Sequence, residues 1–196
     1  MFVLRQGLTF CLASASPRRS ELLKSLGFPF GVCQPECDEP APLPGELPQD
    51  YARRMAECKI RAARCAANTL MAADTIVCVN NRILGKPGDG KEAFAMLQML
   101  NGRMHSVFTA VHLLLPADRE AVFCEESRVM FGNWPASVLR AYADTGESLD
   151  KAGAYAIQGK GAFLVERVQG SFTNVVGLPL TRLTQTLMEK NIISPA

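Results

Sequence analysis

The sequence has few of the residues that build zinc sites, with only two histidines and no C-x-x-C pair among its seven cysteines. Zinc sites of the common spacings need such pairs of ligands, so the sequence predicts none. An odd number of cysteines also does not suggest a disulfide framework. We expect reduced thiols in the cytoplasm, packed as small apolar side chains. The seven are Cys11, Cys33, Cys37, Cys58, Cys65, Cys78 and Cys124.

The chain also lacks a strong net charge and a long apolar run. A formal net charge of +2 is too small to indicate binding to nucleic acid or to a membrane surface. No apolar stretch approaches the roughly 20 residues of a membrane span. Residues 8–15 resemble a short secretory signal with an A-x-A cleavage site, but the apolar part is too short and Thr9 interrupts it. We therefore expect a cytoplasmic protein without nucleic-acid or membrane partners, in which any phosphate site is a local cluster.

Strand-like and helix-like segments alternate along the chain, and two pairs of strands form hairpins. This pattern predicts an α/β fold in which helices flank a mixed, twisted central sheet. The length suits one domain over residues 1–196. Strands are expected at 9–13, 28–33, 70–79, 82–84, 106–115, 121–131, 163–168 and 172–176. Helices are expected at 17–26, 49–67, 91–101, 135–144 and at the C-terminal end.

The first candidate site lies where the first strand gives way to a helix. Ser14 ends the strand, Ser16 suits a helix N-cap, and Pro17 suits the first helical position. Arg18 and Arg19 then place two cations in the first turn. Free N–H groups and guanidinium groups together favour a phosphate or another polyanion. The alternative is an ordinary capped helix with two solvated arginines.

Two carboxylates form the second candidate. Asp74 interrupts the apolar run 70–79, where burial of a charge without a function would be costly. Such a residue can open onto a cleft and hold a divalent metal or orient water, or it can cap a turn at a strand end. Glu39 follows another strand and could supply a second metal ligand, or it is a solvated charge beside a proline-rich loop.

Several cations remain open to either interpretation. Lys59 belongs to a helix with many basic residues, for which a solvated face is the default. Residues 85–91 match the P-loop spacing G-x-x-x-x-G-K, but Glu92 stands in place of the magnesium-binding hydroxyl and Pro87 lacks an N–H. A turn that aims Lys86 into a cleft is the better interpretation.

The segment 150–159 combines charges with small residues and one amide. Its small residues permit close approach of a ligand to the backbone, or simply tight packing. Gln158 supplies a hydrogen-bond donor and an acceptor, which suit the edge of a base.

Taken together, these segments resemble the Maf family of nucleoside triphosphate pyrophosphatases from about residue 8 to residue 187. Several motifs agree in order and spacing, which makes the resemblance specific. The motifs are LASASPRR at 12–19, DE at 38–39, ADTIV at 73–77, LGKP at 84–87, the helix 92–102 with His105 and Thr109, DKAGAY with IQG at 150–159, and VGLPL at 176–180.

The resemblance implies a two-lobed fold with a central cleft, a homodimer, and a divalent cation, Mg²⁺ or Mn²⁺. It implies hydrolysis of the α–β bond of a nucleoside triphosphate. By motif, Asp74 matches the proton acceptor and, with Glu39, the metal-binding carboxylates. The substrate-binding positions implied by the resemblance and the segment 150–159 are Ser14, Arg18, Arg19, Lys59, Thr75, Lys86, Asp150, Lys151 and Gln158. Of these, Arg18, Thr75 and Gln158 match positions linked to substrate choice.

The residue at 158 points to a substrate within that family. Uracil and thymine present carbonyl acceptors and one N3–H donor, which an amide matches with both of its functions. The IQG version of the motif resembles the branch that hydrolyses dTTP and UTP, and modified pyrimidine triphosphates are further candidates. The alternatives are a Maf-type enzyme preferring 7-methyl-GTP and a nucleotide-binding regulator of cell division without turnover.

Overall fold

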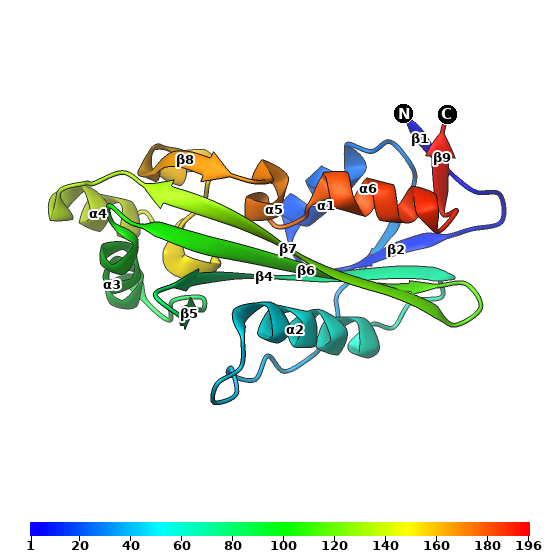
Figure 1. The fold of residues 1–196 in the computed structure, drawn as a ribbon, viewed down its shortest axis with the longest axis horizontal. Helices are drawn as coiled ribbons and strands as arrows, with labels where there is room; N and C mark the ends of the chain where they lie inside the picture. Colours follow the sequence, from blue (N-terminus) through cyan, green and yellow to red (C-terminus); the bar gives the residue numbers. More distant parts are fainter. The chain divides into compact units, whose positions relative to one another are not determined.

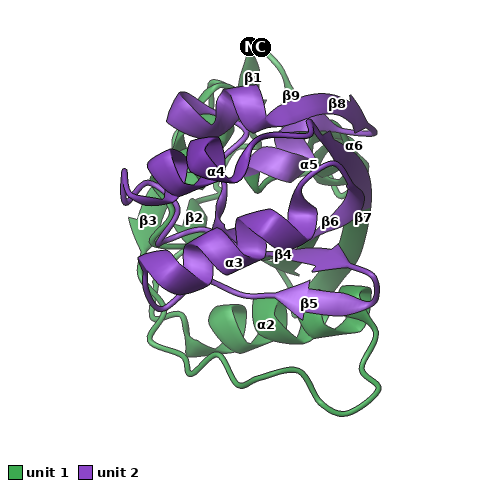
Figure 2. Cartoon of the chain, turned by 90° about the vertical axis from the view of Figure 1, so that its left-hand side faces the viewer, with its two compact units in different colours: residues 1–74, 109–125, 177–196 green, residues 75–108, 126–176 purple.

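The computed structural model describes residues 1–196, which form two compact units (Figure 2). Unit 1 comprises Met1–Asp74, Thr109–Glu125 and Gly177–Ala196, and unit 2 comprises Thr75–Phe108 and Glu126–Val176. The boundary falls within three long strands, so that each strand contributes one part to each unit. The two units are described separately below.

Helices and strands alternate along the chain, as the sequence predicts. Paired strands follow the order β3-β2-β4-β6-β7-β8, with β5 added to β4, and β1 pairs with β9. Strand β2 is parallel to β3 and to β4, whereas β5 is antiparallel to β4 and β8 to β7, which confirms a mixed sheet. The elements are β1 (Phe2–Leu4), β2 (Phe10–Ala13), α1 (Pro17–Lys24), β3 (Gly31–Cys33), α2 (Pro48–Ala62), β4 (Thr69–Val79), β5 (Arg82–Leu84), α3 (Gly90–Leu100), β6 (Met104–Leu115), β7 (Arg119–Phe131), α4 (Ala136–Ala143), η1 (Ala152–Ala154), η2 (Gly159–Leu164), β8 (Val165–Gln169), α5 (Phe172–Val176), α6 (Leu180–Glu189) and β9 (Ile193–Pro195).

In unit 1, helices cover both faces of the strands. Successive side chains of a strand point to opposite faces. Leu12 of β2 therefore packs in the cluster that includes Leu23 of α1 and Leu183 of α6, while the next residue, Ala13, packs against Ile60 of α2. Figure 1 shows α1 and α6 on one side of β2 and α2 on the other. A strand buried on both faces explains why Phe10–Ala13 is continuously apolar.

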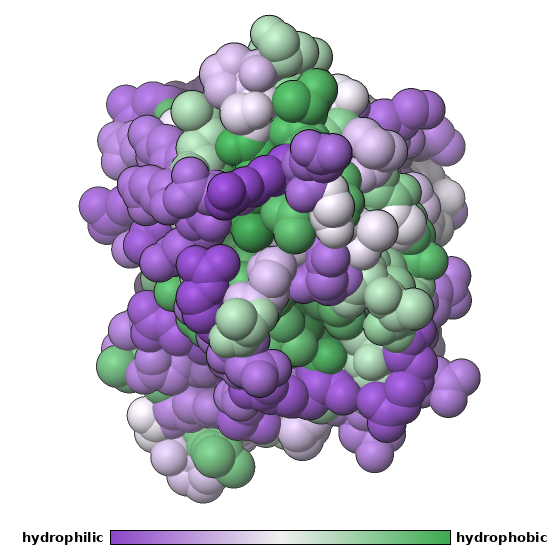
Figure 3. Space-filling model, turned by 90° about the vertical axis from the view of Figure 1, so that its right-hand side faces the viewer, coloured by the Kyte–Doolittle hydropathy of each residue, from purple (hydrophilic) through white to green (hydrophobic).

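The two chain ends also belong to unit 1. Strands β1 and β9 pair in antiparallel fashion, with Val3 opposite Ser194, so that both ends meet (Figure 1). Apolar side chains reach the surface of the face drawn in Figure 3 among mostly hydrophilic residues. Met1 and Val3 are themselves exposed. None of the helices has the length and apolar character needed to cross a bilayer.

Unit 2 has its own apolar core, which includes Leu97 of α3, Leu139 of α4 and Phe131 of β7. The P-loop-like segment turns out to end in a helix cap. The Asp89 carboxylate accepts a hydrogen bond from Glu92 N at 2.8 Å, and the Glu92 carboxylate accepts one from Gly88 N at 2.7 Å. Such reciprocal bonds satisfy backbone N–H groups at the helix start. They account for Asp89 and Glu92 at these positions without a bound phosphate.

Three predicted elements need correction. Residues 172–176 form the short helix α5 rather than a strand, because Ser171 Oγ accepts a hydrogen bond from Asn174 N at 3.2 Å and starts a helical turn. The buried Asn174 amide then bonds the carbonyl of Val107 and Ser127 Oγ. The segment 159–164 is a 3-10 helix, so the following strand starts at Val165 and not at 163.

Helix α2 ends at Ala62, five residues earlier than predicted. The next residue, Ala63, is extended, which lets the chain return to the sheet. Asn68 there exchanges hydrogen bonds with Thr9, and Thr69 N donates to the Thr9 carbonyl. The pairing of β4 with β2 therefore overrides the helix propensity of the alanines at 62–67.

Candidate active site

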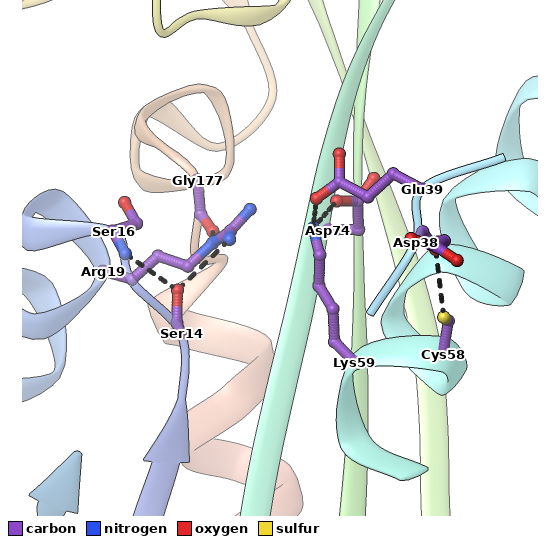
Figure 4. Close-up of polar contacts among 9 residues, drawn as sticks. All are labelled: Ser14, Ser16, Arg19, Asp38, Glu39, Cys58, Lys59, Asp74 and Gly177. Atoms are coloured by element: carbon purple, nitrogen blue, oxygen red, sulfur yellow. Dashed lines mark hydrogen bonds and ion pairs between the residues drawn. The ribbon is translucent and has the colours of Figure 1, made fainter. Parts of the chain in front are cut away.

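The first part of the site lies in unit 1 at the carboxyl end of β2, where the chain enters α1 (Figure 4). The parallel strands β2 and β3 end side by side at Ala13 and Cys33. Ligands of open α/β sheets bind at this edge. Ser14 N–H donates to the Cys33 carbonyl at 2.9 Å, and Ser14 Oγ accepts a hydrogen bond from Ser16 N at 3.1 Å. Ser16 occupies the N-cap position, but its side chain makes no capping bond. The side chain of Ser14, rather than that of Ser16, therefore accepts the backbone hydrogen bond at this helix start.

Arg19 is held in place by groups far away in the sequence. Its Nε donates to the carbonyl of Gly177 at 2.9 Å, and one terminal nitrogen lies 3.5 Å from Ser14 Oγ. Burial lowers the pKa of Arg19, the negative charge of Asp74 opposes that shift, and the positive charge of Arg18 adds to it. A guanidinium remains charged under these conditions. The structure thus holds the guanidinium of Arg19 in one position. A bound anion would reduce the repulsion between Arg19 and Arg18.

The second part of the site is an ion-pair cluster on the other side of β4 in Figure 4. Asp74 follows Ala72 at strand spacing and so faces α2 as Ala72 does. The Lys59 ammonium on α2 contacts an Asp74 carboxylate oxygen and lies 2.9 Å from Glu39 Oε1. The side chains of Lys59 and Asp74 are only 13% and 11% exposed, against 42% for Glu39. Asp74 lies inside β4 and not at a strand end. It therefore does not cap a turn, which was the alternative interpretation.

Electrostatics keep the ammonium of Lys59 charged. Burial alone would lower the pKa of Lys59, and Arg19 acts in the same direction. The carboxylates of Asp74 and Glu39 outweigh both, and the pKa is raised above its usual value. Because Lys59 Nζ contacts both Asp74 and Glu39, the two carboxylates can reach a single cation. Carboxylate oxygens are the ligands that Mg²⁺ and Mn²⁺ prefer. The residues present therefore fit a divalent metal.

The other predicted residues belong to unit 2. Thr75 is half-buried, and Lys86 and Gln158 are exposed. Lys151 Nζ donates to the Glu147 carbonyl and to Asp150 Oδ1, each at 2.6 Å. Asp150 and Lys151 therefore form a local ion pair of which Lys151 is the buried member, with a side chain 12% exposed.

The loop that carries Gln158 is fastened on both sides. The Glu147 carboxylate accepts hydrogen bonds from the backbone N–H groups of Lys160 and Gly161, each at 3.0 Å. On the other side, Tyr142 Oη accepts one from Ala156 N at 3.2 Å. At Gly159, where φ is +73°, a Cβ atom would lie 2.5 Å from Glu147 Oε1. The positive φ favours glycine at this position, and the close approach of Glu147 adds to that preference.

Sequence motifs did not reveal the roles of two residues that hold other parts of the site, Gly177 and Glu147. Gly177 belongs to the motif at 176–180, but nothing local indicates that its carbonyl orients Arg19. Glu147 lies outside the quoted motifs, and its acidic side chain alone gives no sign that it binds a loop. Lys59, for which a phosphate contact is predicted, forms ion pairs with the two carboxylates of unit 1.

Comparison with known proteins gives consistent results. The sequence model described as Maf-like protein matches residues 9–190. A dTTP/UTP pyrophosphatase of Nitratidesulfovibrio vulgaris is 45% identical over 184 residues, which cover 93% of this chain and 88% of that protein. One from Oleidesulfovibrio alaskensis is 44% identical, covering 94% and 86%. A HAM1 protein from Coxiella burnetii has the same fold, with a TM-score of 0.54 at 17% identity, covering 93% of this chain and 99% of that one.

Proposed function

This chain belongs to the Maf family, and we propose on that basis that it hydrolyses dTTP and UTP to the monophosphate and pyrophosphate. The observation that carries the proposal is the cluster of Asp74, Glu39 and Lys59, whose charges interact with that of Arg19. Relatives named dTTP/UTP pyrophosphatase support the substrate. The cluster supplies the charges that phosphoanhydride hydrolysis needs.

The phosphate-binding part of the site is assigned to the start of α1. Arg18 and Arg19 are cations in its first turn, and the N-terminus of a helix favours an anion. Ser14 and Gly177 hold the Arg19 guanidinium in one orientation before substrate arrives. Pre-orientation lowers the cost of binding a phosphate.

Glu39 and Asp74 would hold a divalent metal, Mg²⁺ or Mn²⁺, since both already contact one cationic nitrogen. Such an ion neutralises charge on the phosphoryl oxygens. In our proposal the Lys59 ammonium keeps the two carboxylates close together when no substrate is bound, and it becomes a phosphate ligand when the carboxylates are engaged.

Asp74 is assigned the proton-transfer step. Its carboxylate accepts a proton from a water molecule while the water oxygen bonds to the α-phosphorus. The bond from the α-phosphorus to the bridging oxygen breaks, and pyrophosphate leaves with that electron pair. Arg18, Arg19, Lys59 and Lys86 stabilise the charge that develops on the leaving group. No covalent intermediate with the protein forms.

Selection of the base is assigned to unit 2. The Gln158 amide pairs one donor and one acceptor with the edge of uracil or thymine, and Thr75 and Arg18 contribute to the choice of substrate. Asp150 and Lys151, which form an ion pair on the same segment, are assigned to substrate binding with Gln158. We further propose a homodimer, as the family resemblance implies, and a cytoplasmic location, as expected for free thiols.

The test is pyrophosphate release from a panel of triphosphates by the purified protein with Mg²⁺ or Mn²⁺. The panel contains dTTP, UTP, modified pyrimidine triphosphates, the purine triphosphates and 7-methyl-GTP. We expect the highest kcat/KM with dTTP and UTP. A preference for 7-methyl-GTP would overturn the pyrimidine assignment.

Asp74→Asn separates an enzyme from a nucleotide-binding regulator. Removal of a general base costs about 10²–10⁴-fold in rate, so kcat should fall by at least two orders of magnitude while UTP still binds. Asp50→Asn is the matched control, because Asp50 lies on the exposed surface of unit 1 and pairs only with Arg53 among the ion pairs described. Binding without measurable turnover in the unmodified protein would favour the regulator.

A further inference from the structure

Three cysteines that are distant in the sequence meet in unit 1. Cys11 lies in β2, Cys33 ends β3, and Cys65 follows the end of α2. Their three sulfur atoms all lie within 4.8 Å of one another. All three are free thiols. No short spacing in the sequence marks this group, since each cysteine comes from a different element.

The strand register explains why the sulfur atoms converge. Cys11 pairs with Gly31 and Ala13 pairs with Cys33 in the parallel ladder of β2 and β3. Cys11 and Cys33 are thus two residues apart in register and share one face of the sheet. This is the face of Ala13, which packs against Ile60 of α2. Where α2 ends, the chain brings Cys65 to the same place.

A glycine lies beside the sulfur atom of Cys11. Cys11 is opposite Gly31, and a Cβ atom at Gly31 would lie 4.0 Å from Cys11 Sγ. The three thiols also differ in depth, because Cys11 is buried, Cys33 is half-buried and Cys65 is exposed. An ion could therefore enter from the side of Cys65.

We propose that Cys11, Cys33 and Cys65 bind one soft d¹⁰ metal ion, Zn²⁺ or Cu(I), through three thiolates. At a metal–sulfur distance of about 2.3 Å, ligands of one ion lie roughly 4 Å apart, so rotation of the side chains brings the observed sulfur atoms into range. Thiolates select Zn²⁺ and Cu(I) over Mg²⁺, which prefers oxygen ligands. A water molecule at the exposed side completes a four-coordinate Zn²⁺, whereas Cu(I) needs only the three sulfur atoms.

This site differs in chemistry from the carboxylates Glu39 and Asp74. Ser14 N–H donates to the Cys33 carbonyl, so the cysteine group adjoins the start of α1 through the backbone. A second pair of thiols, Cys37 and Cys58, also lies in unit 1, and burial together with hydrogen bonding to Cys58 raises the pKa of Cys37 to about 11. Any measurement of metal binding has to separate this pair from the three cysteines.

The experiment titrates the reduced full-length protein, without oxygen, with Zn²⁺, Cu(I) and Cd²⁺ in separate arms. Cd²⁺ serves as a spectroscopic probe through its sulfur-to-metal charge-transfer band, and native mass spectrometry counts the ions bound. We expect one ion per chain, proton release on binding, and no displacement by excess Mg²⁺. The Zn²⁺ and Cu(I) arms decide which ion binds more tightly.

Cys65→Ser is the decisive variant, because an exposed residue can be replaced without disturbing the core. Loss of a direct ligand should weaken binding by more than the roughly 10–100-fold typical of outer-shell partners. Cys33→Ser should have the same effect, and Cys58→Ser should have none. Binding that survives Cys65→Ser, or that is lost in Cys58→Ser, would overturn the proposal.

Discussion

Lys59 is the residue on which the charge balance of unit 1 depends. It is located four residues after Met55 on the buried side of α2, so its ammonium reaches the sheet instead of the solvent. There it separates two carboxylates, of which Asp74 is almost fully buried. Without a cation between them, these groups would repel each other in a poorly solvated place.

Lys59→Met should therefore destabilise the protein when divalent ions are absent. Breaking a buried ion pair costs about 3–5 kcal/mol, and the exposure of Glu39 reduces this to roughly 1–3 kcal/mol. Mg²⁺ or Mn²⁺ should restore part of the loss, since the carboxylates would then share the added ion. Chemical denaturation with and without the ions measures both effects, and Lys24→Met on the exposed side of α1 is the control. Equal stabilisation by Mg²⁺ in variant and parent would contradict the assignment of the carboxylates.

Gln158 provides a second test at the scale of one side chain. Gln158→Glu replaces a donor and acceptor by acceptors alone, so the carbonyl oxygens of uracil lose a partner. A lost hydrogen bond that leaves a group unsatisfied costs about 1–3 kcal/mol, and kcat/KM for UTP should fall roughly tenfold to a hundredfold. Gln169→Glu on the exposed end of β8 should leave the value unchanged. An unchanged preference for UTP in the Gln158 variant would remove this residue from base selection.

At the scale of elements, the segment 156–161 shows how a polar loop is given one shape. Its backbone N–H groups are bound from both sides by Glu147 and Tyr142. Burial opposes ionisation of Glu147, but the hydrogen bonds from Lys160, Tyr142 and Gly161 prevail and lower its pKa. The contribution to stability is thus present above the ordinary pKa of about 4.5 and is lost as the pH falls further.

Glu147→Gln should loosen this loop. An amide has one acceptor oxygen in place of two, and its NH₂ group would face one of the backbone N–H donors. We expect faster hydrogen exchange at Lys160 and Gly161, and a KM for UTP that rises more than kcat falls, because Gln158 is held less well. Glu166→Gln, on the exposed surface of β8, should change neither. Normal exchange rates in the Glu147 variant would show that the carboxylate does not hold the loop.

The periodicity of apolar residues predicted most helices and strands, because in those segments the apolar positions are the buried ones. Alternation of strands and helices and the start of α1 at Pro17 follow from nearby residues. It failed at α5, where five residues of strand-like composition form a helix because Ser171 and the buried Asn174 satisfy its polar groups. It also failed at the end of α2, where pairing with Thr9 decides the boundary. The end of α2 is decided by contacts distant in the chain, whereas α5 combines a local bond at Ser171 with distant bonds from Asn174 to Val107 and Ser127.

At the scale of the whole molecule, the candidate site was predictable where function requires an unusual residue in a regular element. Asp74 is conspicuous as a charge within an apolar strand, and the two arginines are conspicuous at a helix start. Residues that position others could not be found in this way. The Gly177 carbonyl, Glu147 and the three cysteines of unit 1 are chemically ordinary in the sequence, and only the fold brings them to their partners.

The pH dependence of folding should report on a histidine outside the candidate site. His105 is 2% exposed in unit 2, between Phe131 and Tyr155, and its Nε2 lies 2.8 Å from Tyr155 Oη. Burial lowers the pKa of His105 to about 4. The ring is consequently neutral in the folded protein at pH 6.

The sign of the effect follows from proton uptake. Between about pH 6.5 and pH 4 the unfolded chain binds a proton at His105 that the folded protein does not, so the free energy of unfolding falls as the pH falls. The loss amounts to roughly 3 kcal/mol over this range, at 1.36 kcal/mol per pKa unit. Urea denaturation from pH 7.5 to pH 4 measures it, and His105→Gln, which cannot titrate, should flatten the slope even if the variant is less stable overall. A slope identical in variant and parent would mean that another group controls acid stability.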